Sequence, residues 1–189
     1  MHKRKVGIMG GTFDPIHNGH LILAEHSRIQ FDLEKVIFIP TGKPPHKVEK
    51  GISLINHRYD MTLLAICTNK YFDLSLIEIQ REGTTYTIDT IKQLKTENKD
   101  TDYYFILGAD SLFNISSWKG YEELLNICNF IVAKRPSTDN NKLKAKIEEL
   151  NKIHKDPIYI LETPLIDISS SSIRERVRSK LSIKYLVPD

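Results

Sequence analysis

A short segment near the start of the chain combines two glycines with two histidines. Gly10 and Gly11 follow an apolar run, and His17 and His20 stand three residues apart where a helix is expected to begin. Glycines let a backbone approach an anion closely, and a helix start offers free N–H groups and the positive end of the helix dipole. Imidazoles can donate to phosphate oxygens and, when protonated, offset the charge that builds in phosphoryl transfer. The combination predicts a phosphate-binding site, although each feature alone would equally suit a tight turn or a surface helix cap.

A run of serines near the other end of the chain has related chemistry. Ser169 to Ser172 precede Ile173 and Arg174, in a stretch whose pattern indicates an N-cap and a helix start. Capping alone would explain the serines. Hydroxyls, free N–H groups and an arginine one turn into the helix would also bind an anion. Two anion sites near opposite ends of one chain suit a single triphosphate held between them.

The apolar pattern predicts the scaffold that positions these residues. Short β-rich runs alternate with segments of helical period. Strands are expected at residues 5–9, 35–39, 73–79, 103–107, 130–133 and 158–161. Helices are expected at about 18–31, 53–67, 87–98, 120–128, 139–154 and 170–179. This alternation predicts a single α/β domain over residues 1–189, with a mostly parallel open sheet, helices on both faces, and a ligand site beyond the carboxyl ends of the strands.

The second expected helix contains apolar residues at the spacing of one helix face, namely Ile55, Tyr59, Leu63 and Ile66. His57 and Arg58 fall between them. We expect this pair to serve the surface and packing rather than catalysis.

Composition limits the classes of function. The 189 residues include 27 basic and 24 acidic side chains, a net charge of +3, which is too balanced to favour a nucleic-acid groove. No apolar run approaches the roughly 20 residues of a membrane span, and the start of the chain does not resemble a signal peptide. Cys67 and Cys128 are far apart in the sequence and belong to no CxxC motif, which favours two free thiols in a reducing cytosol. A cytoplasmic protein without membrane or nucleic-acid partners is expected.

Both end segments resemble motifs of one superfamily. His17-Asn18-Gly19-His20 is similar to the HxGH signature of the adenylyl/cytidylyl-transferases. The serine segment resembles their ISSTxIR motif, with Ser171 where threonine is usual, so the hydroxyl is kept. The resemblance implies a Rossmann-like fold in which the glycine turn and both histidines hold a nucleoside triphosphate while pyrophosphate departs.

Motifs in the middle of the chain narrow the resemblance to bacterial nicotinate-nucleotide adenylyltransferases. In order, they are Lys43-Pro44-Pro45-His46-Lys47, Glu82 to Thr90, Leu107-Gly108-Ala109-Asp110, Ser117-Trp118-Lys119 and Ala133-Lys134-Arg135-Pro136. The likeness runs from Val6 to Asp189. It implies transfer of the adenylyl group of ATP to nicotinate mononucleotide, giving nicotinate adenine dinucleotide and pyrophosphate.

The resemblance also assigns roles to residues. His17, His20 and Arg174 would be catalytic, by stabilising charge, because the acceptor phosphate already carries a nucleophilic oxygen and needs no general base. ATP would be bound by Gly10, Gly11, Thr12, Phe13, His17, His20, Gly108, Asp110, Arg135, Ser170, Ser171, Ile173 and Arg174. The acceptor would be bound by Lys43, His46, Lys47, Thr85, Tyr86 and Trp118. Mg²⁺ is expected to be carried mainly by the ATP phosphates, because no carboxylate cluster is visible in the sequence.

The acceptor residues have other readings. Trp118, the only tryptophan, offers a face on which a pyridine ring could stack, but a lone tryptophan also suits a core. The Thr85-Tyr86 turn could present N–H groups to a carboxylate or merely cap a helix. The Lys43–Lys47 loop could neutralise a phosphate or lie in solvent, and Asp110 could bind ribose or adenine or cap a helix. Nicotinamide mononucleotide or phosphopantetheine remain alternative acceptors, a non-catalytic nucleotide-binding regulator remains a rival, and assembly into a homo-oligomer is left open.

Overall fold

The computed structural model describes residues 3–43, 51–154 and 157–189. Its centre is a parallel sheet of six strands in the order β3-β2-β1-β4-β5-β6. The strands are β1 Arg4–Gly11, β2 Lys35–Pro40, β3 Phe72–Leu74, β4 Thr101–Gly108, β5 Asn129–Ala133 and β6 Tyr159–Leu161. This is the Rossmann strand order, and it confirms the predicted α/β fold.

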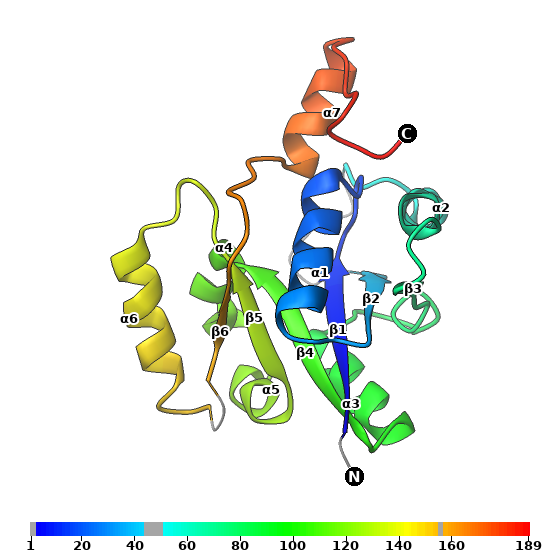
Figure 1. Ribbon diagram of the computed structural model, residues 1–189. Helices are drawn as coiled ribbons and strands as arrows, with labels where there is room; N and C mark the ends of the chain where they lie inside the picture. Colours follow the sequence, from blue (N-terminus) through cyan, green and yellow to red (C-terminus); the bar gives the residue numbers. More distant parts are fainter. Residues whose placement is uncertain (1–2, 44–50, 155–156) are drawn as a thin grey trace.

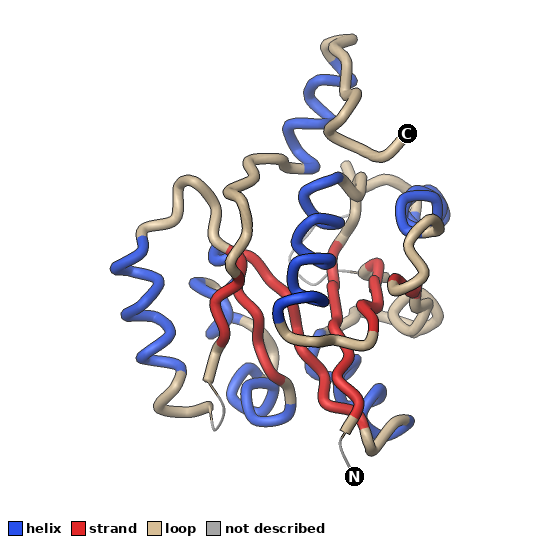
Figure 2. The backbone as a smooth tube through the Cα atoms, in the orientation of Figure 1, coloured by secondary structure: helices blue, strands red, loops and turns tan. Residues whose placement is uncertain are grey.

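The helices lie on both faces of this sheet, as Figures 1 and 2 show. They are α1 Asn18–Gln30, α2 Ile55–Ile66, α3 Thr87–Glu97, α4 Ala109–Phe113, α5 Tyr121–Ile127, α6 Asn140–Leu150 and α7 Ser170–Arg178, with a 3₁₀ turn η1 at Ile115–Ser117. Helices α1 and α2 pack in one apolar cluster with strand residues such as Phe38 and Ile131. Helices α3 to α6 pack in a second cluster with residues such as Ile8 and Phe130. Because both faces are covered, the central strands are apolar along most of their length.

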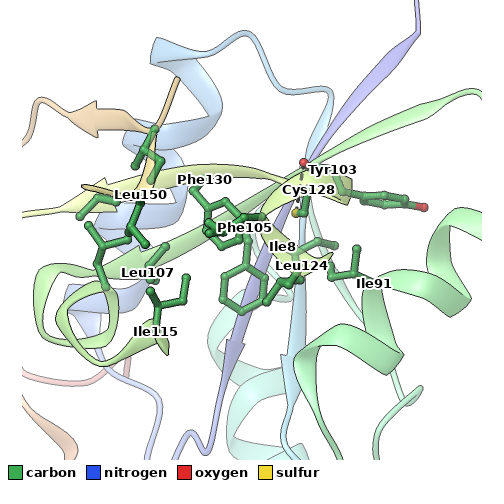
Figure 3. Packing of buried hydrophobic residues seen from close by; sticks show 14 of the residues in the cluster. Ile8, Ile91, Tyr103, Phe105, Leu107, Ile115, Leu124, Cys128, Phe130 and Leu150 are labelled. Carbon is green, nitrogen blue, oxygen red and sulfur yellow. Dashed lines mark hydrogen bonds between the residues drawn. The ribbon is translucent and has the colours of Figure 1, made fainter. Parts of the chain in front are cut away.

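The second cluster is the larger one and is drawn in Figure 3. Phe105 and Phe130, on neighbouring strands, lie at its centre with ring centroids 6.3 Å apart. Leu124 of α5 and Ile91 of α3 close it from the helix side, and both are fully buried. This packing fixes β4, whose carboxyl end leads into the site.

Four sequence predictions about the elements were incomplete or wrong. The third strand ends at Leu74 instead of continuing to residue 79, because β3 is an edge strand and the chain turns just after it. Ser75 N–H still donates to Phe38 O, and then Gln80 N–H donates back to Leu76 O. The helix predicted over residues 139–154, which is α6, ends at Leu150. The short α4 and η1 were not predicted, since five and three residues carry too little periodicity to read.

The face of α2 is the fourth difference. The buried residues of this helix are Arg58, Thr62, Ala65 and Ile66. Leu63, which the apolar spacing placed on one face with Ile66, is 42% exposed, and Ile55 and Tyr59 are only partly buried. The helix therefore turns a cation and a hydroxyl toward the protein, and an apolar pattern cannot indicate that arrangement.

The strand order creates the place for a site. The chain leaves β1 toward β2 on one side and returns in β4 on the other, so the connections after β1 and β4 diverge at the carboxyl edge of the sheet. Ligands of open α/β sheets bind in the crevice at such a switch point. In Figure 1, α7 lies beyond this same edge, next to the start of α1. None of the helices in the described ranges is long and apolar enough to cross a membrane.

Candidate active site

A pocket of about 400 Å³ opens at the switch point, beyond the ends of β1, β2, β4 and β5. It brings together many of the residues predicted from the sequence: Gly10, Gly11, Thr12, His17, His20, Thr85, Tyr86, Gly108, Asp110, Trp118 and Arg135. The two segments predicted to bind the nucleotide and the acceptor ring thus face one cavity.

The two histidines lie at the start of α1. His17 is the N-cap residue with extended backbone, and its N–H donates to Nδ1 of His20 at 3.3 Å. The two rings are stacked with centroids 3.7 Å apart, and Phe13 meets His20 edge-on at 5.1 Å. Phe13 is itself buried and outside the pocket lining, so its ring supports His20 and its predicted contact with ATP stays a prediction. Its φ of 47° is a left-handed conformation, which a bulky residue rarely adopts outside a tightly constrained turn.

Both imidazoles are neutral at pH 7 in this state. Burial, together with the nearby Arg135 guanidinium, lowers the pKa of His17 to about 4. Burial lowers the pKa of His20 to about 3, and His17 and Arg135 add to the effect. A neutral His20 whose Nδ1 accepts a hydrogen bond carries its proton on Nε2. Each ring can therefore donate to a phosphate oxygen without being charged beforehand.

Nδ1 of His17 is buried and has no hydrogen-bond partner among the residues that the structure describes. Buried polar atoms are nearly always hydrogen-bonded, so an unpaired one at a residue that lines a pocket marks a candidate binding position. This atom fits a site for a polar, anionic group at the start of α1.

A charged pair also lines the pocket. Nε of Arg135, just after β5, lies 3.3 Å from Oδ2 of Asp110 in the first turn of α4. The backbone N–H of Arg135 donates to Oγ1 of Thr138, which shapes the loop that follows β5. Both charged side chains are substantially exposed, so either can exchange its partner for a ligand at small cost.

The far end of the pocket has an aromatic wall. Trp118 is partly buried, lines the cavity and meets Phe105 edge-on at 5.9 Å, so it is neither a core tryptophan nor a free one. Lys119 Nζ lies 4.3 Å above the ring of Tyr86, which is the N-cap residue of α3. The N–H of Thr85 donates to Lys43 O, so the amides left to face a ligand are those from Tyr86 onward, where α3 begins.

Glu78 was not predicted and also lines this end of the pocket. Glu78 is 7% exposed as a residue. Its carboxylate accepts from Oγ1 of Thr90 at 2.8 Å and interacts with Thr85 and the backbone of Gly42. Burial raises its pKa, and these hydrogen bonds partly oppose the effect. Glu78 was missed because the sequence pattern assigns residues 73–79 to a strand. Nothing in that assignment indicated that the Glu78 side chain would be buried.

The serine–arginine helix holds the glycine–histidine segment from outside the pocket. Ser170 Oγ donates to Pro15 O at 2.8 Å, and Arg174 Nη1 donates to Asp14 O at 2.6 Å. Ser171 is exposed and Ile173 is buried at 1% exposure. Of the α7 residues predicted to bind ATP, none lines the pocket in this state, although Ile166 and Ile168 just before the helix do.

The comparisons with known proteins agree with this geometry. The cytidylyltransferase-like family matches residues 8–176. A relative from Thermoanaerobacter sp. (strain X514), named "Probable nicotinate-nucleotide adenylyltransferase", is 50% identical over 98% of this chain and 88% of its own length. A relative of the same name from Moorella thermoacetica is 46% identical over 98% and 86%. The chain belongs to the nicotinate-nucleotide adenylyltransferase family.

A solved structure shares the fold of this family. The Plasmodium falciparum nicotinic acid mononucleotide adenylyltransferase complexed with NaAD superposes with a TM-score of 0.76 at 23% identity, covering 95% of this chain and 87% of that one. At this level of identity the likeness supports the fold and not the individual contacts.

Some residues predicted for the family's acceptor lie outside the pocket or outside what the structure describes. Lys43 is exposed and is not part of the lining. His46 and Lys47 fall outside the described residues, so their roles stay predictions. Thr41, Lys119 and Lys134 line the pocket and were not assigned. The two lysines stand directly beside the predicted Trp118 and Arg135, which is the signal that could have found them.

The described residues include no group of three or more His, Cys, Asp or Glu side chains that could hold a metal ion. The acidic groups at the pocket are already engaged, Asp110 with Arg135 and Glu78 with Thr90. These residues are compatible with an ion held mainly by a triphosphate, with few protein ligands.

Proposed function

We infer that this chain transfers the adenylyl group of ATP to nicotinate mononucleotide, producing nicotinate adenine dinucleotide and pyrophosphate. The observation that carries the inference is that one cavity is lined both by the paired histidines of the α1 start and by Trp118 with the α3 start. Family membership supports the reaction, and the residues that line the cavity support a shared site for the two substrates.

The reaction we propose is an in-line displacement at the α-phosphorus of ATP. An oxygen of the acceptor phosphate forms the new P–O bond, the bond to the β-phosphate oxygen breaks, and pyrophosphate leaves with that electron pair. The attacking oxygen is already anionic, so no side chain has to remove a proton. The work left to the protein is positioning and charge stabilisation.

In this proposal the His17 and His20 rings and the N–H groups at the start of α1 donate to the phosphate oxygens as charge shifts toward pyrophosphate. Arg135 would turn from Asp110 to the phosphates. Arg174 would act on the nucleotide only by moving off Asp14, so its direct catalytic role stays a prediction. Mg²⁺ bound to ATP would supply further charge neutralisation.

The acceptor ring would stack on Trp118, with its carboxylate facing the N–H groups at the start of α3. Lys119, 3.2 Å from Asp89 and beside Tyr86, adds a positive charge at the same end. We propose that these groups favour the acid over the amide substrate. A cytoplasmic location is likewise proposed, from one exposed and one buried free thiol.

The test is pyrophosphate release from ATP across a panel of acceptors: nicotinate mononucleotide, nicotinamide mononucleotide and phosphopantetheine. Nicotinate mononucleotide is expected to give the highest kcat/KM. In His20→Ala, kcat should fall by about 100-fold or more, the effect of removing a charge-stabilising donor.

His26→Ala is the matched control, because His26 lies on the same helix but outside the pocket lining. It should keep the parent's kcat. A preference for the amide would contradict the acceptor assignment. A His20→Ala enzyme within a few-fold of the parent would contradict the role of the HxGH motif.

A further inference from the structure

Arg58 is a buried cation that the reaction described above does not use. It lies in the first turn of α2 and is 2% exposed. Its guanidinium donates only to backbone carbonyls among the described residues: Nε to Ser53 O at 3.2 Å, Nη1 to Thr12 O at 2.7 Å and to Thr41 O at 2.8 Å, and Nη2 to Gly42 O at 3.3 Å. Burying a charged arginine costs free energy unless its N–H groups are hydrogen-bonded. The four carbonyl acceptors supply those hydrogen bonds, so they form a specific binding site for the guanidinium.

The four carbonyls belong to three segments that meet around the pocket. Thr12 lies in the glycine turn after β1, and Thr41 and Gly42 follow β2 and lead toward the acceptor end. Ser53 precedes α2. Thr12 and Thr41 both line the pocket, whereas Arg58 does not. A single nitrogen, Nη1, is shared between the carbonyls of Thr12 and Thr41, so it sets the spacing between the two walls.

Asp14 supplies the countercharge. Its side chain is 6% exposed, and its Oδ2 accepts from the N–H of Ser53 at 3.2 Å. Burial lowers the pKa of Arg58 while the charge of Asp14 raises it, and an arginine stays protonated in either case. Asp14 also contacts Arg174 through its carbonyl. The ends of the glycine turn, α2 and α7 therefore converge on one charged cluster.

Packing on the acceptor side restricts the same segment. A Cβ atom added at Gly42 would overlap the carbonyl oxygen of Glu78, so this stretch of backbone lies directly against the turn after β3. The N–H of Thr41 donates to Gly11 O at 2.8 Å. β1 and β2 no longer pair beyond this point. Arg58 connects the segments that follow them by donating to the carbonyls of both Thr12 and Thr41.

We propose that Arg58 is a positioning residue that holds the ATP-binding turn and the acceptor-side segment at a fixed separation, so that the two phosphates meet in reactive geometry. The proposal rests on the proposed function, because it assigns the two walls to the two substrates. Arg58 touches neither substrate. Its loss should therefore impair the transfer step more than the binding of either ligand alone, since a misplacement of about 1 Å can cost on the order of 100-fold in rate.

Arg58→Lys tests this, because lysine keeps the charge beside Asp14 but lacks the planar fork that reaches several carbonyls at once. The expected result is a kcat lowered by about 10- to 100-fold. The Kd values for ATP and nicotinate mononucleotide, each measured alone by calorimetry, should stay within about 3-fold of the parent. Arg28→Lys is the matched control, since Arg28 is held by Glu25 and Tyr71 away from the pocket, and its kcat should not change.

A folded Arg58→Lys enzyme with the parent's kcat would overturn the proposal. So would a kcat loss matched by equal loss of binding for each ligand alone, which would make Arg58 part of the individual sites. If Arg58→Lys does not fold, Arg58→Ala is assayed with added methylguanidinium, which should raise kcat in a saturable way, and no rise would also overturn it. Failure of the proposed function is distinct, because the parent itself would then show no turnover.

Discussion

At the scale of single residues, His17 and His20 occupy one buried environment near Arg135. Burial and the Arg135 charge lower the pKa of both rings, and His17 further lowers the pKa of His20. A polyphosphate brings negative charge to this place and should raise both pKa values. By linkage, ATP binding below neutral pH should then take up protons. Burial therefore keeps both rings neutral, and a bound polyphosphate would oppose this effect.

The lowered pKa values of His17 and His20 predict how the stability of the fold depends on pH. In the unfolded chain both histidines titrate near 6.5, whereas the folded values are about 4 and about 3. Above about pH 6.5 neither state binds these protons, so their contribution to stability is fully present. As the pH falls from about 6.5 toward 4, the unfolded chain takes up protons that the folded one does not, and stability is lost.

The measurement is Tm between pH 7.5 and 4.5, with and without ATP, for the parent and for a His17→Asn, His20→Asn double variant. The parent should lose more Tm than the variant over this range, because asparagine does not titrate. ATP should reduce the parent's loss. Identical profiles for parent and variant would contradict the depressed pKa values.

At the scale of elements, α7 acts as a brace on the turn that precedes α1. Ser169 caps it by accepting from Ser172 N–H at 3.1 Å, and Ser170 and Arg174 then reach the carbonyls of Pro15 and Asp14. The motif resemblance treats Ser170 and Ser171 alike, but their surroundings differ. The hydroxyl of Ser170 donates to the Pro15 carbonyl at 2.8 Å, whereas Ser171 is exposed and its hydroxyl only accepts a long, 3.4 Å bond from Arg174 Nη2.

The difference predicts separable effects of two substitutions. Ser170→Ala should lower the free energy of unfolding by about 1 kcal/mol, because the Pro15 carbonyl loses its partner. Ser171→Ala should change that free energy by less than about 0.5 kcal/mol, and should raise the KM for ATP if this hydroxyl contacts the phosphates. Urea unfolding and initial rates measure the two quantities. A larger stability loss in Ser171→Ala than in Ser170→Ala would contradict the brace.

The elements also show what the sequence can predict. Runs such as residues 36–39 are apolar because the strand is covered on both faces, so composition alone locates them. The turn after Leu74 and the inward face of α2 depend on partners far along the chain: Glu78 needs Thr90, and Arg58 needs Thr12 and Thr41. A polar residue looks alike in sequence whether it meets water or a buried carbonyl. The sequence therefore predicts the positions of the motifs. It does not predict the buried polar residues, such as Glu78 and Arg58, that pack behind them.

At the scale of the whole molecule, the strands of one sheet contribute residues to both apolar clusters and to the pocket. The ends of β1 and β4 line the pocket and other residues of the same strands belong to both cores, so we expect the site and the core to open together. A ligand that binds only the folded form should therefore stabilise the far side of the larger cluster as well. Cys128 lies there, 4% exposed, with its Sγ donating to Tyr103 O at 3.4 Å (Figure 3).

The reactivity of the Cys128 thiol should therefore report the opening of the larger apolar cluster. Burial raises the pKa of its thiol to about 12, and the thiolate is the reactive form, so a disulfide reagent should modify it only when the core opens. Cys67 is exposed and should react at once, so the assay uses Cys67→Ser. Nicotinate adenine dinucleotide at 100 times its Kd should slow the labelling of Cys128 by about 100-fold. Labelling that stays fast with bound ligand would show that Cys128 is exposed by local opening, and that the site and the core do not unfold as one unit.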